Sequence, residues 1–255
     1  MTSTYIDSGI TTADRFLPRL FVADEVRSAT VTATSGTPAP VKNLTTYSAW
    51  TPSAFPATVT ADFGGSKSFD YVAAYLKSAS GNYDLEYWNG SAWVAIGTTL
   101  SRTTPGCILW LFPSKSAAKI RITCSAASDV AVIKCGASTQ IPVGIPVGYE
   151  PALFNPNEKL GNAISVTGQI LGTQVESQRI DETLNFDLID PDWINNTYMP
   201  IRLLIREVGV FFAWNLADFA SHVIYGAVVG DPKASYSQVD CMRLQLKLEG
   251  QKHVL

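Results

Sequence analysis

Charged side chains are scarce in this chain. Asp, Glu, Lys and Arg make up 16% of its 255 residues, and the net charge is −3, whereas about a quarter of the residues of an average soluble domain are charged. The sequence contains no run of basic residues, which a protein needs if it binds nucleic acid mainly by neutralising phosphates. We therefore expect no nucleic acid among the partners. A lightly charged surface is also typical of a protein that other proteins partly cover.

Histidine is scarcer still, because the chain has only His222 and His253. A Ser-His-Asp triad needs one of them as its base. Ser221 directly precedes His222, so in a strand the two side chains point to opposite faces, and we expect His253 to lie in a frayed end. The same scarcity argues against a zinc site. We expect no catalytic residue, no metal ligand and no cofactor.

Carboxylate pairs are the remaining candidates for catalysis, since glycoside hydrolysis uses two acidic side chains. Asp190 and Asp192 flank Pro191, a pattern that the start of a helix explains more simply. Asp84 and Glu86 share one face of an expected strand. Glycan cleavage stays open as an alternative, but we expect that the protein is not an enzyme. Dense Asp/Asn loops for calcium and Gly-rich loops for phosphate are missing as well.

The few cysteines follow no motif. Cys107, Cys124, Cys135 and Cys241 are scattered without CxxC spacing, and the second and third lie in apolar runs (IRITCSA and VAVIKCGA) where thiols usually pack as small core residues. We expect buried free thiols, as in a reducing compartment.

Long hydrophobic runs are also absent. The longest, residues 208–214 (VGVFFAW), contains a glycine and is far shorter than the roughly 20 residues that cross a bilayer. The start of the chain (MTSTYIDSGITTADRF) has no basic stretch followed by an apolar one, so we expect no signal peptide. We expect no membrane insertion and folding in the cytosol where the chain is made.

The chain is instead rich in strand patterns. Short runs of Val, Thr, Ile, Tyr and Trp alternate with Gly, Pro, Ser and Asn through the first half, which is typical of β-structure. Strands are expected at residues 59–63, 69–76 and 83–96, the last broken by Asn89-Gly90. This dipeptide lies between two tryptophans and predicts a hairpin with a type I′ turn.

A Pro/Gly-rich segment divides the sequence at residues 141–148 (IPVGIPVG), because proline blocks ladder hydrogen bonds and glycine relaxes the backbone. We expect an N-terminal arm at 1–27, a β-sandwich at 28–140, this connector at 141–148, and a second β-domain, barrel or sandwich, at 149–255. The apolar segment RFLPRLFV within the arm fits either a strand or a docking arm.

One short helix is expected in the second half, at residues 190–206. Asp190 would cap it and Pro191 would occupy its first turn, and Pro200 would limit it to about two turns before a new start. The cleanest strand pattern of the chain is MRLQLKLE at residues 242–249, where apolar and polar residues alternate throughout.

The first half resembles the opening of discoidin-type, galactose-binding-like domains. The resemblance rests on SATVTAT from Ser28, PAPVKNL from Pro38, the tryptophan Trp50, and VTADFG, in which Asp62-Phe63-Gly64 stands where these domains carry Asp-Leu-Gly. It covers residues 28–140 and implies a jelly-roll sandwich, a fold used for binding and assembly more often than for catalysis.

The whole chain looks like a family of structural proteins of tailed bacteriophages, in which a discoidin-like half precedes a β-domain with a Phe-Phe-Ala-Trp box. Here the box is Phe211-Phe212-Ala213-Trp214, and LQLKLEG closes the pattern from Leu244. Such domains resemble tail-tube and distal-tail barrels, which assemble as rings. The resemblance implies an all-β tail-tip or baseplate protein of the virion, assembled in the bacterial cytoplasm, whose partners are further copies of itself (a hexamer by family analogy) and other tail proteins.

Exposed aromatic residues would be the signal for sugar binding. For the aromatic residues of this chain, packing in a core and contact with a ligand or another protein both stay open. The tryptophans Trp50, Trp88, Trp93 and Trp110 fit core packing better than sugar stacking. In the box, Phe211 points to one face of a strand, and Phe212 and Trp214 point to the other. Both faces are therefore apolar, and we take Phe211, Phe212 and Trp214 as the candidate interface.

The leading hypothesis is a non-enzymatic structural component of a phage tail tip, which forms an oligomeric ring between the tail tube and tip proteins. The alternative is a carbohydrate-binding protein that recognises host surface glycans through loops of the sandwich.

Overall fold

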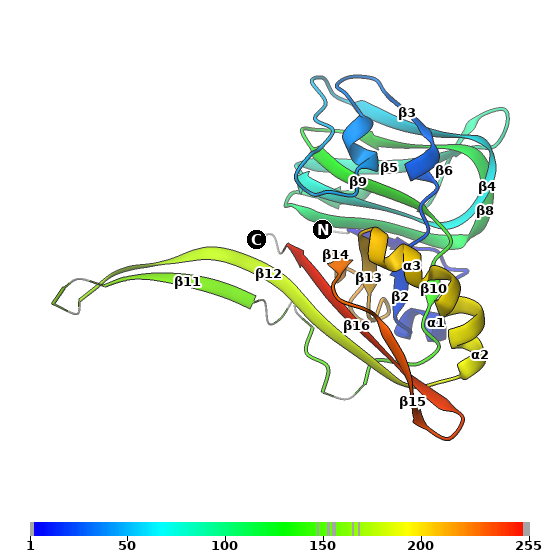
Figure 1. Ribbon diagram of the computed structural model, residues 1–255. Coiled ribbons are helices and arrows are strands. Elements are labelled where there is room, and N and C mark those ends of the chain that lie inside the picture. Colours follow the sequence, from blue (N-terminus) through cyan, green and yellow to red (C-terminus); the bar gives the residue numbers. More distant parts are fainter. Residues whose placement is uncertain are drawn as a thin grey trace.

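Two β-rich domains form the protein, as shown by a computed structural model that describes residues 3–146, 148–151, 154, 157–164, 166–167 and 169–251. Figure 1 shows one domain above the other, with a long two-stranded ribbon that projects from the lower domain. The expected all-β class is confirmed.

Eight strands form the upper, sandwich domain. Their order is β3-β4-β8-β5-β6, while β9 pairs with β4, β7 pairs with β5, and β1 lies parallel to β8. Their bounds are β1 (Thr4–Ile6), β3 (Thr30–Ala33), β4 (Ala57–Ser78), β5 (Gly81–Trp88), β6 (Trp93–Ala95), β7 (Leu100–Arg102), β8 (Gly106–Cys124) and β9 (Asp129–Gly136), with 3₁₀ turns η1 (Val26–Ser28) and η2 (Ala39–Lys42).

The strands expected at 59–63 and 69–76 are two halves of the single strand β4. The first half pairs with β3, the second half pairs with β9, and β8 pairs with both. Register shifts between Asp62 and Lys67 and between Phe69 and Tyr71 separate the halves. Such irregularities bend a strand and let it pass from one layer to the other.

The hairpin at Asn89-Gly90 is present, but the expected type I′ turn is wrong. Trp88 pairs with Trp93, so the loop has four residues, and within it only Gly90 has a positive φ, of 103°. Asn89 acts through its side chain, whose Oδ1 accepts hydrogen bonds from the backbone N–H groups of Ser91 and Ala92. This side-chain turn competes with the type I′ geometry.

The lower, second domain is a sheet with the strand order β10-β2-β13-β14-β16-β12-β11, and β15 pairs with β16. The strands are β2 (Arg19–Phe21), β10 (Thr139–Gln140), β11 (Asn157–Ile164), β12 (Ile170–Ile189), β13 (Val210–Ala213), β14 (Val223–Val228), β15 (Lys233–Gln238) and β16 (Cys241–Gln251). The strand pattern MRLQLKLE falls in β16, where Leu244, Leu246 and Leu248 are buried as the alternation predicts.

Apart from its first strand β1, the sandwich is an insertion in the second domain. The segment expected as an arm contributes β1 to the sandwich and β2 to the other sheet, with helix α1 (Thr12–Phe16) between them. β2 pairs with β10 and β13. The chain therefore leaves the second domain after β2, builds the sandwich, and returns at β10 before the Pro/Gly segment.

The helical segment runs without a break from Pro191 to Glu207, through α2 (Pro191–Trp193), the π-helical turn η3 (Ile194–Tyr198) and α3 (Met199–Glu207). Asp190 caps it as expected, because its side chain accepts a hydrogen bond from the N–H of Asp192 at 2.8 Å. The interruption expected at Pro200 does not occur. The wider π turn precedes this proline, which then occupies the first turn of α3, where its missing N–H is tolerated.

Two cores stabilise the domains, one inside the sandwich around Trp50 and Trp110, and one in the second domain around Phe186 and Phe212. The four cysteines are free, as expected, and three of them are buried. Among the described helices, none has the length and apolar character to cross a bilayer.

Candidate functional site: an interdomain cleft and a projecting hairpin

A third apolar cluster joins the two domains. Tyr71 and Tyr75 of β4 meet Phe21, Phe211 and Tyr225 of the second domain. Ring centroids are 4.9 Å apart for Phe21 and Tyr71, and 5.7 Å apart for Tyr75 and Tyr225. A contact of this apolar character fixes domains more firmly than the polar contacts that permit relative motion.

The candidate interface residues lie in and around this junction. Phe211 is 0% exposed and packs in the cluster between the domains, whereas Phe212 is 1% exposed and packs in the core of the second domain. Trp214 is half-buried and stacks on Phe219 at 4.6 Å. The two faces of β13 are thus both covered by this chain. A contact of these residues with another protein stays a prediction.

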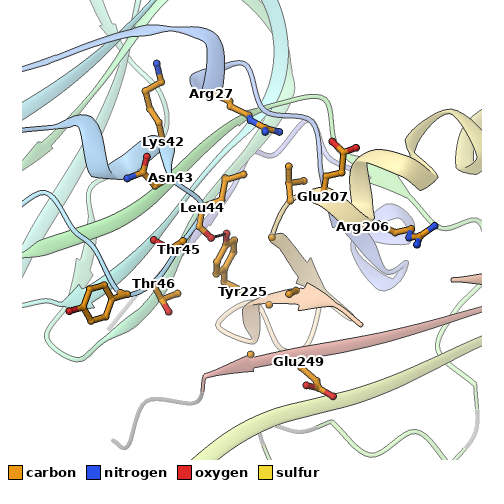
Figure 2. A pocket seen from close by; sticks show the side chains of 16 residues that line it. Arg27, Lys42, Asn43, Leu44, Thr45, Thr46, Arg206, Glu207, Tyr225 and Glu249 are labelled. Atoms are coloured by element: carbon orange, nitrogen blue, oxygen red, sulfur yellow. Dashed lines mark hydrogen bonds between the residues drawn. The ribbon is translucent and has the colours of Figure 1, made fainter. Parts of the chain in front are cut away.

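A cleft of about 760 Å³ opens beside this junction, between the two domains. Figure 2 shows its two walls, with the loop after η2 on the sandwich side and the end of α3, β14 and β16 on the other side. The sandwich wall carries Arg27 and the segment Lys42, Asn43, Leu44, Thr45, Thr46 and Tyr47; the opposite wall carries Arg206, Glu207, Tyr225 and Glu249.

Tyr225 closes the cleft at its base. Its hydroxyl donates a hydrogen bond of 2.7 Å to the backbone carbonyl of Leu44, across the domain boundary (Figure 2). Burial raises the pKa of this hydroxyl well above its usual value, so it stays a neutral donor. Gly209 leaves room for it, because a Cβ at that position would overlap the Tyr225 hydroxyl.

Charge of both signs lines the cleft. In Figure 2 the side chain of Arg27 points towards the end of α3, where Glu207 lies. At the rim, the ring of Tyr47 is 89% exposed, and the ammonium of Lys77 lies 5.7 Å from its centroid. The cleft therefore combines a cation, an anion, amide and hydroxyl groups and an open aromatic ring, a set suited to holding a polar ligand.

The side chains examined for catalysis have structural partners in the described part of the chain. His222 stacks on Phe219 at 5.1 Å, and burial lowers its pKa. Asp84 accepts a hydrogen bond from Thr99, and Glu86 pairs with Arg121. Among the described residues, no three His, Cys, Asp or Glu side chains come together in a metal-binding arrangement. His253 lies outside the described residues.

The tryptophans divide into two groups. Trp50 and Trp110 are buried in the sandwich core. Trp88 and Trp93 are half-buried and meet edge to face at 5.4 Å, with the guanidinium of Arg121 4.5 Å from the Trp93 ring. Core packing and bracing of the hairpin thus account for these four tryptophans, as expected from the sequence, which favoured packing over sugar stacking. The exposed ring at the cleft is that of Tyr47, and no motif in the sequence marks it.

The second candidate site is the ribbon of β11 and β12. From Arg179 onward β12 pairs with β16, whereas its earlier residues pair, within the described part of the chain, with β11 alone. The ribbon therefore extends beyond the rest of the sheet, and Figure 1 shows it reaching away from both domains. The backbone of β11 has no other strand partner within the described chain.

Comparison with known proteins finds no family model and no curated protein that matches. Solved structures of carbohydrate-binding modules match a little under half of the chain. One is chitosan-binding module 1 from a chitosanase/glucanase of Paenibacillus sp. IK-5 (TM-score 0.41, 15% identity, 44% of this chain and 97% of that chain). Another is CpGH89CBM32-5 of Clostridium perfringens in complex with GalNAc-β-1,3-galactose (TM-score 0.40, 16% identity, 45% and 100%). A GH29 fucosidase of Ruminococcus gnavus matches over 46% of this chain and 27% of its own length (TM-score 0.39, 19% identity). None of the three is a tail protein.

Proposed function

We propose that this chain is a non-enzymatic structural component of a bacteriophage tail tip or baseplate, and that it assembles through the ribbon of β11 and β12 into an oligomeric ring. The observation that carries the proposal is the part of the ribbon beyond Arg179, which has no third strand among the residues that the structure describes. A two-stranded hairpin alone is barely stable in water, and an open strand edge is a template for pairing with another chain. A projecting ribbon of this kind gains its stability from a neighbour.

The rest of the molecule supports the same role. Phe211 and Phe212 of the candidate interface are covered within the chain, whereas the ribbon offers an open strand edge for contacts between copies. The chemistry found in the cleft is that of binding. Of the carboxylates considered for hydrolysis, Asp190 caps a helix, Asp84 accepts a hydrogen bond from Thr99, and Glu86 pairs with Arg121. The virion and the tail proteins as partners rest on the sequence resemblance.

A shortened ribbon tests this role. Replacing residues 158–178 with Asn-Gly joins Asn157 to Arg179, which are paired in the structure, through a two-residue turn. We expect the full chain to form oligomers of its 27.6 kDa subunit, measured by light scattering after gel filtration, and the shortened chain to be a monomer with an unchanged circular dichroism spectrum.

The matched control replaces Val239-Asp240, the turn of the exposed hairpin between β15 and β16, with the same Asn-Gly. This variant should assemble like the full chain. A full chain that is monomeric at every concentration and never joins tail particles would contradict the proposal, and so would a shortened chain that still assembles.

Glycan recognition is the second candidate function, and the exposed ring of Tyr47 favours it. A planar aromatic ring stacks on the apolar face of a pyranose, while nearby amide, hydroxyl and charged groups bind its hydroxyls. Asn43 and Thr46 offer such groups in the same cleft wall. Binding of this kind would place the protein at the host surface during attachment.

A glycan array with the full chain tests this second candidate. If the sandwich side of the cleft binds a sugar, Tyr47→Ala should abolish the signal, while Tyr236→Ala, which removes a ring that is 72% exposed in the second domain, should leave it unchanged. The absence of any bound glycan, or equal loss in both variants, would exclude Tyr47 from sugar binding. Neither result bears on the ribbon.

A further inference from the structure

A fully buried lysine lies where the two domains meet. Lys134 of β9 is 0% exposed. Its Nζ donates one hydrogen bond of 2.9 Å to the carbonyl of Val22, where the chain leaves β2, and another of 2.7 Å to the carbonyl of Gly209, just before β13. The ammonium group of Lys134, a sandwich residue, thus binds two backbone segments of the second domain, one directly after β2 and the other directly before β13.

Asp24 provides the opposite charge near this ammonium. One of its oxygens, Oδ1, accepts hydrogen bonds from the backbone N–H groups of Val26 at 3.0 Å and Arg27 at 3.3 Å. The other oxygen, Oδ2, is buried without a hydrogen-bond partner. A buried carboxylate that is only half satisfied carries a desolvation cost.

Further ionisable groups surround the pair from each element packed against it. They are Arg27 of η1, Tyr71 of β4, Cys135 of β9 and Tyr225 of β14. Burial raises the pKa values of both tyrosines and of the thiol well above their usual range, so these three stay neutral. The charges that act on the pair are therefore those of Lys134, Asp24 and Arg27, while the carboxylates of Glu25 and Asp70 act on the neighbouring Cys135 thiol.

We propose that Lys134 and Asp24 form a charged latch between the domains, which holds the sandwich on the second domain least tightly near neutral pH and more tightly in acid and in alkali. Both groups must leave water when the junction closes. The ammonium bonds two carbonyls and the carboxylate bonds two backbone N–H groups, so no direct ion pair between them offsets that cost. A neutral amine keeps two N–H groups for the same carbonyls, and a protonated Asp24 no longer buries a charge, so neutralising either group removes part of the cost.

The directions of the pKa shifts give the same pH dependence. Burial lowers the pKa of Lys134 from 10.5 to about 8, so its stabilising contribution is complete above 10.5 and is lost as the pH falls through about 8. Burial raises the pKa of Asp24 from 3.8 to about 6, so its contribution is complete below 3.8 and is lost as the pH rises through about 6. The junction is therefore held least tightly between about pH 6 and about pH 8.

Hydrogen exchange of the full chain tests the latch. Exchange rates of amides in residues 21–26 and 208–212 are divided by their intrinsic rates at about pH 4.5, 7 and 10, and are compared with those of core strand β4. We expect junction opening to be at least about tenfold more frequent at neutral pH than at either extreme, since one pKa unit is a factor of ten in the equilibrium.

The double variant Asp24→Asn with Lys134→Met should lose this pH dependence. The control pair Asp62→Asn with Lys119→Met, which removes an exposed 2.7 Å ion pair of the same domain, should keep it. Side-chain NMR of the wild-type lysine amines adds a readout that needs no variant: one amine should titrate near pH 8. Junction exchange that does not vary with pH, or a double variant with the wild-type profile, would overturn the proposal.

Discussion

Tyr225 is the residue at which both domains and the cleft meet. Its ring packs against Phe211 at 4.6 Å and against Tyr75 of the sandwich at 5.7 Å. Its hydroxyl spans the domain boundary to the carbonyl of Leu44. One side chain thus contributes apolar burial to the junction and a polar contact to the floor of the cleft.

Removing only the hydroxyl separates these contributions. In Tyr225→Phe the ring contacts remain, but the Leu44 carbonyl loses its donor, so we expect the free energy of unfolding to fall by about 1 kcal/mol. Urea denaturation followed by fluorescence measures this change. Tyr236→Phe, at an exposed tyrosine, should have no effect, and an equal loss in both variants would refute the role of the hydrogen bond.

At the scale of elements, the helix from Pro191 to Glu207 shows which of its features follow from neighbouring residues in the sequence and which do not. Its start follows from Asp190 and Pro191, because a cap and a proline in the first turn act through neighbouring backbone groups. Its course through Pro200 does not follow from sequence, since the π turn that accommodates this proline depends on how Ile194 and Tyr198 pack in the core.

The cap can be tested by itself. Asp190→Ala removes the acceptor for the N–H of Asp192 and should lower the free energy of unfolding by about 1 kcal/mol. Asp190→Asn keeps a capping oxygen and should cost only a few tenths of that. Thermal unfolding followed by circular dichroism compares the two variants, and equal losses would mean that the charge, rather than the cap, stabilises the helix.

Strand positions were predictable from alternation, but strand partners were not. The pattern MRLQLKLE identified β16 because each leucine faces the core. In contrast, nothing local shows that β2 pairs with β13 about 190 residues later, or that the halves of β4 are one strand. The cleft depends on the same long-range pairing, so Tyr47 and Glu207 could not be brought together from sequence. Lys134 had a local signal, a lysine inside the apolar run VAVIKCGA.

At the scale of the whole molecule, the insertion of the sandwich between β2 and β10 ties the two domains together. Three chain segments cross between them, after β1, β2 and β9, and the apolar cluster around Phe21, Tyr71 and Phe211 buries the surface where they meet. A large apolar contact opposes relative motion of domains. The angle between the sandwich and the ribbon is therefore set by contacts within the chain.

This coupling predicts how the protein melts. Because the junction core belongs to both domains, we expect a single calorimetric transition for the full chain. Phe211→Ala opens a cavity in that core and should cost about 3–5 kcal/mol, most of it at the junction, so the transition should separate into two as the domains unfold independently. Phe16→Ala removes a ring that is 45% exposed and should leave one transition at nearly the same temperature. Two transitions already present in the unaltered chain would show that the junction does not couple the domains, and the sandwich would then be free to move relative to the ribbon.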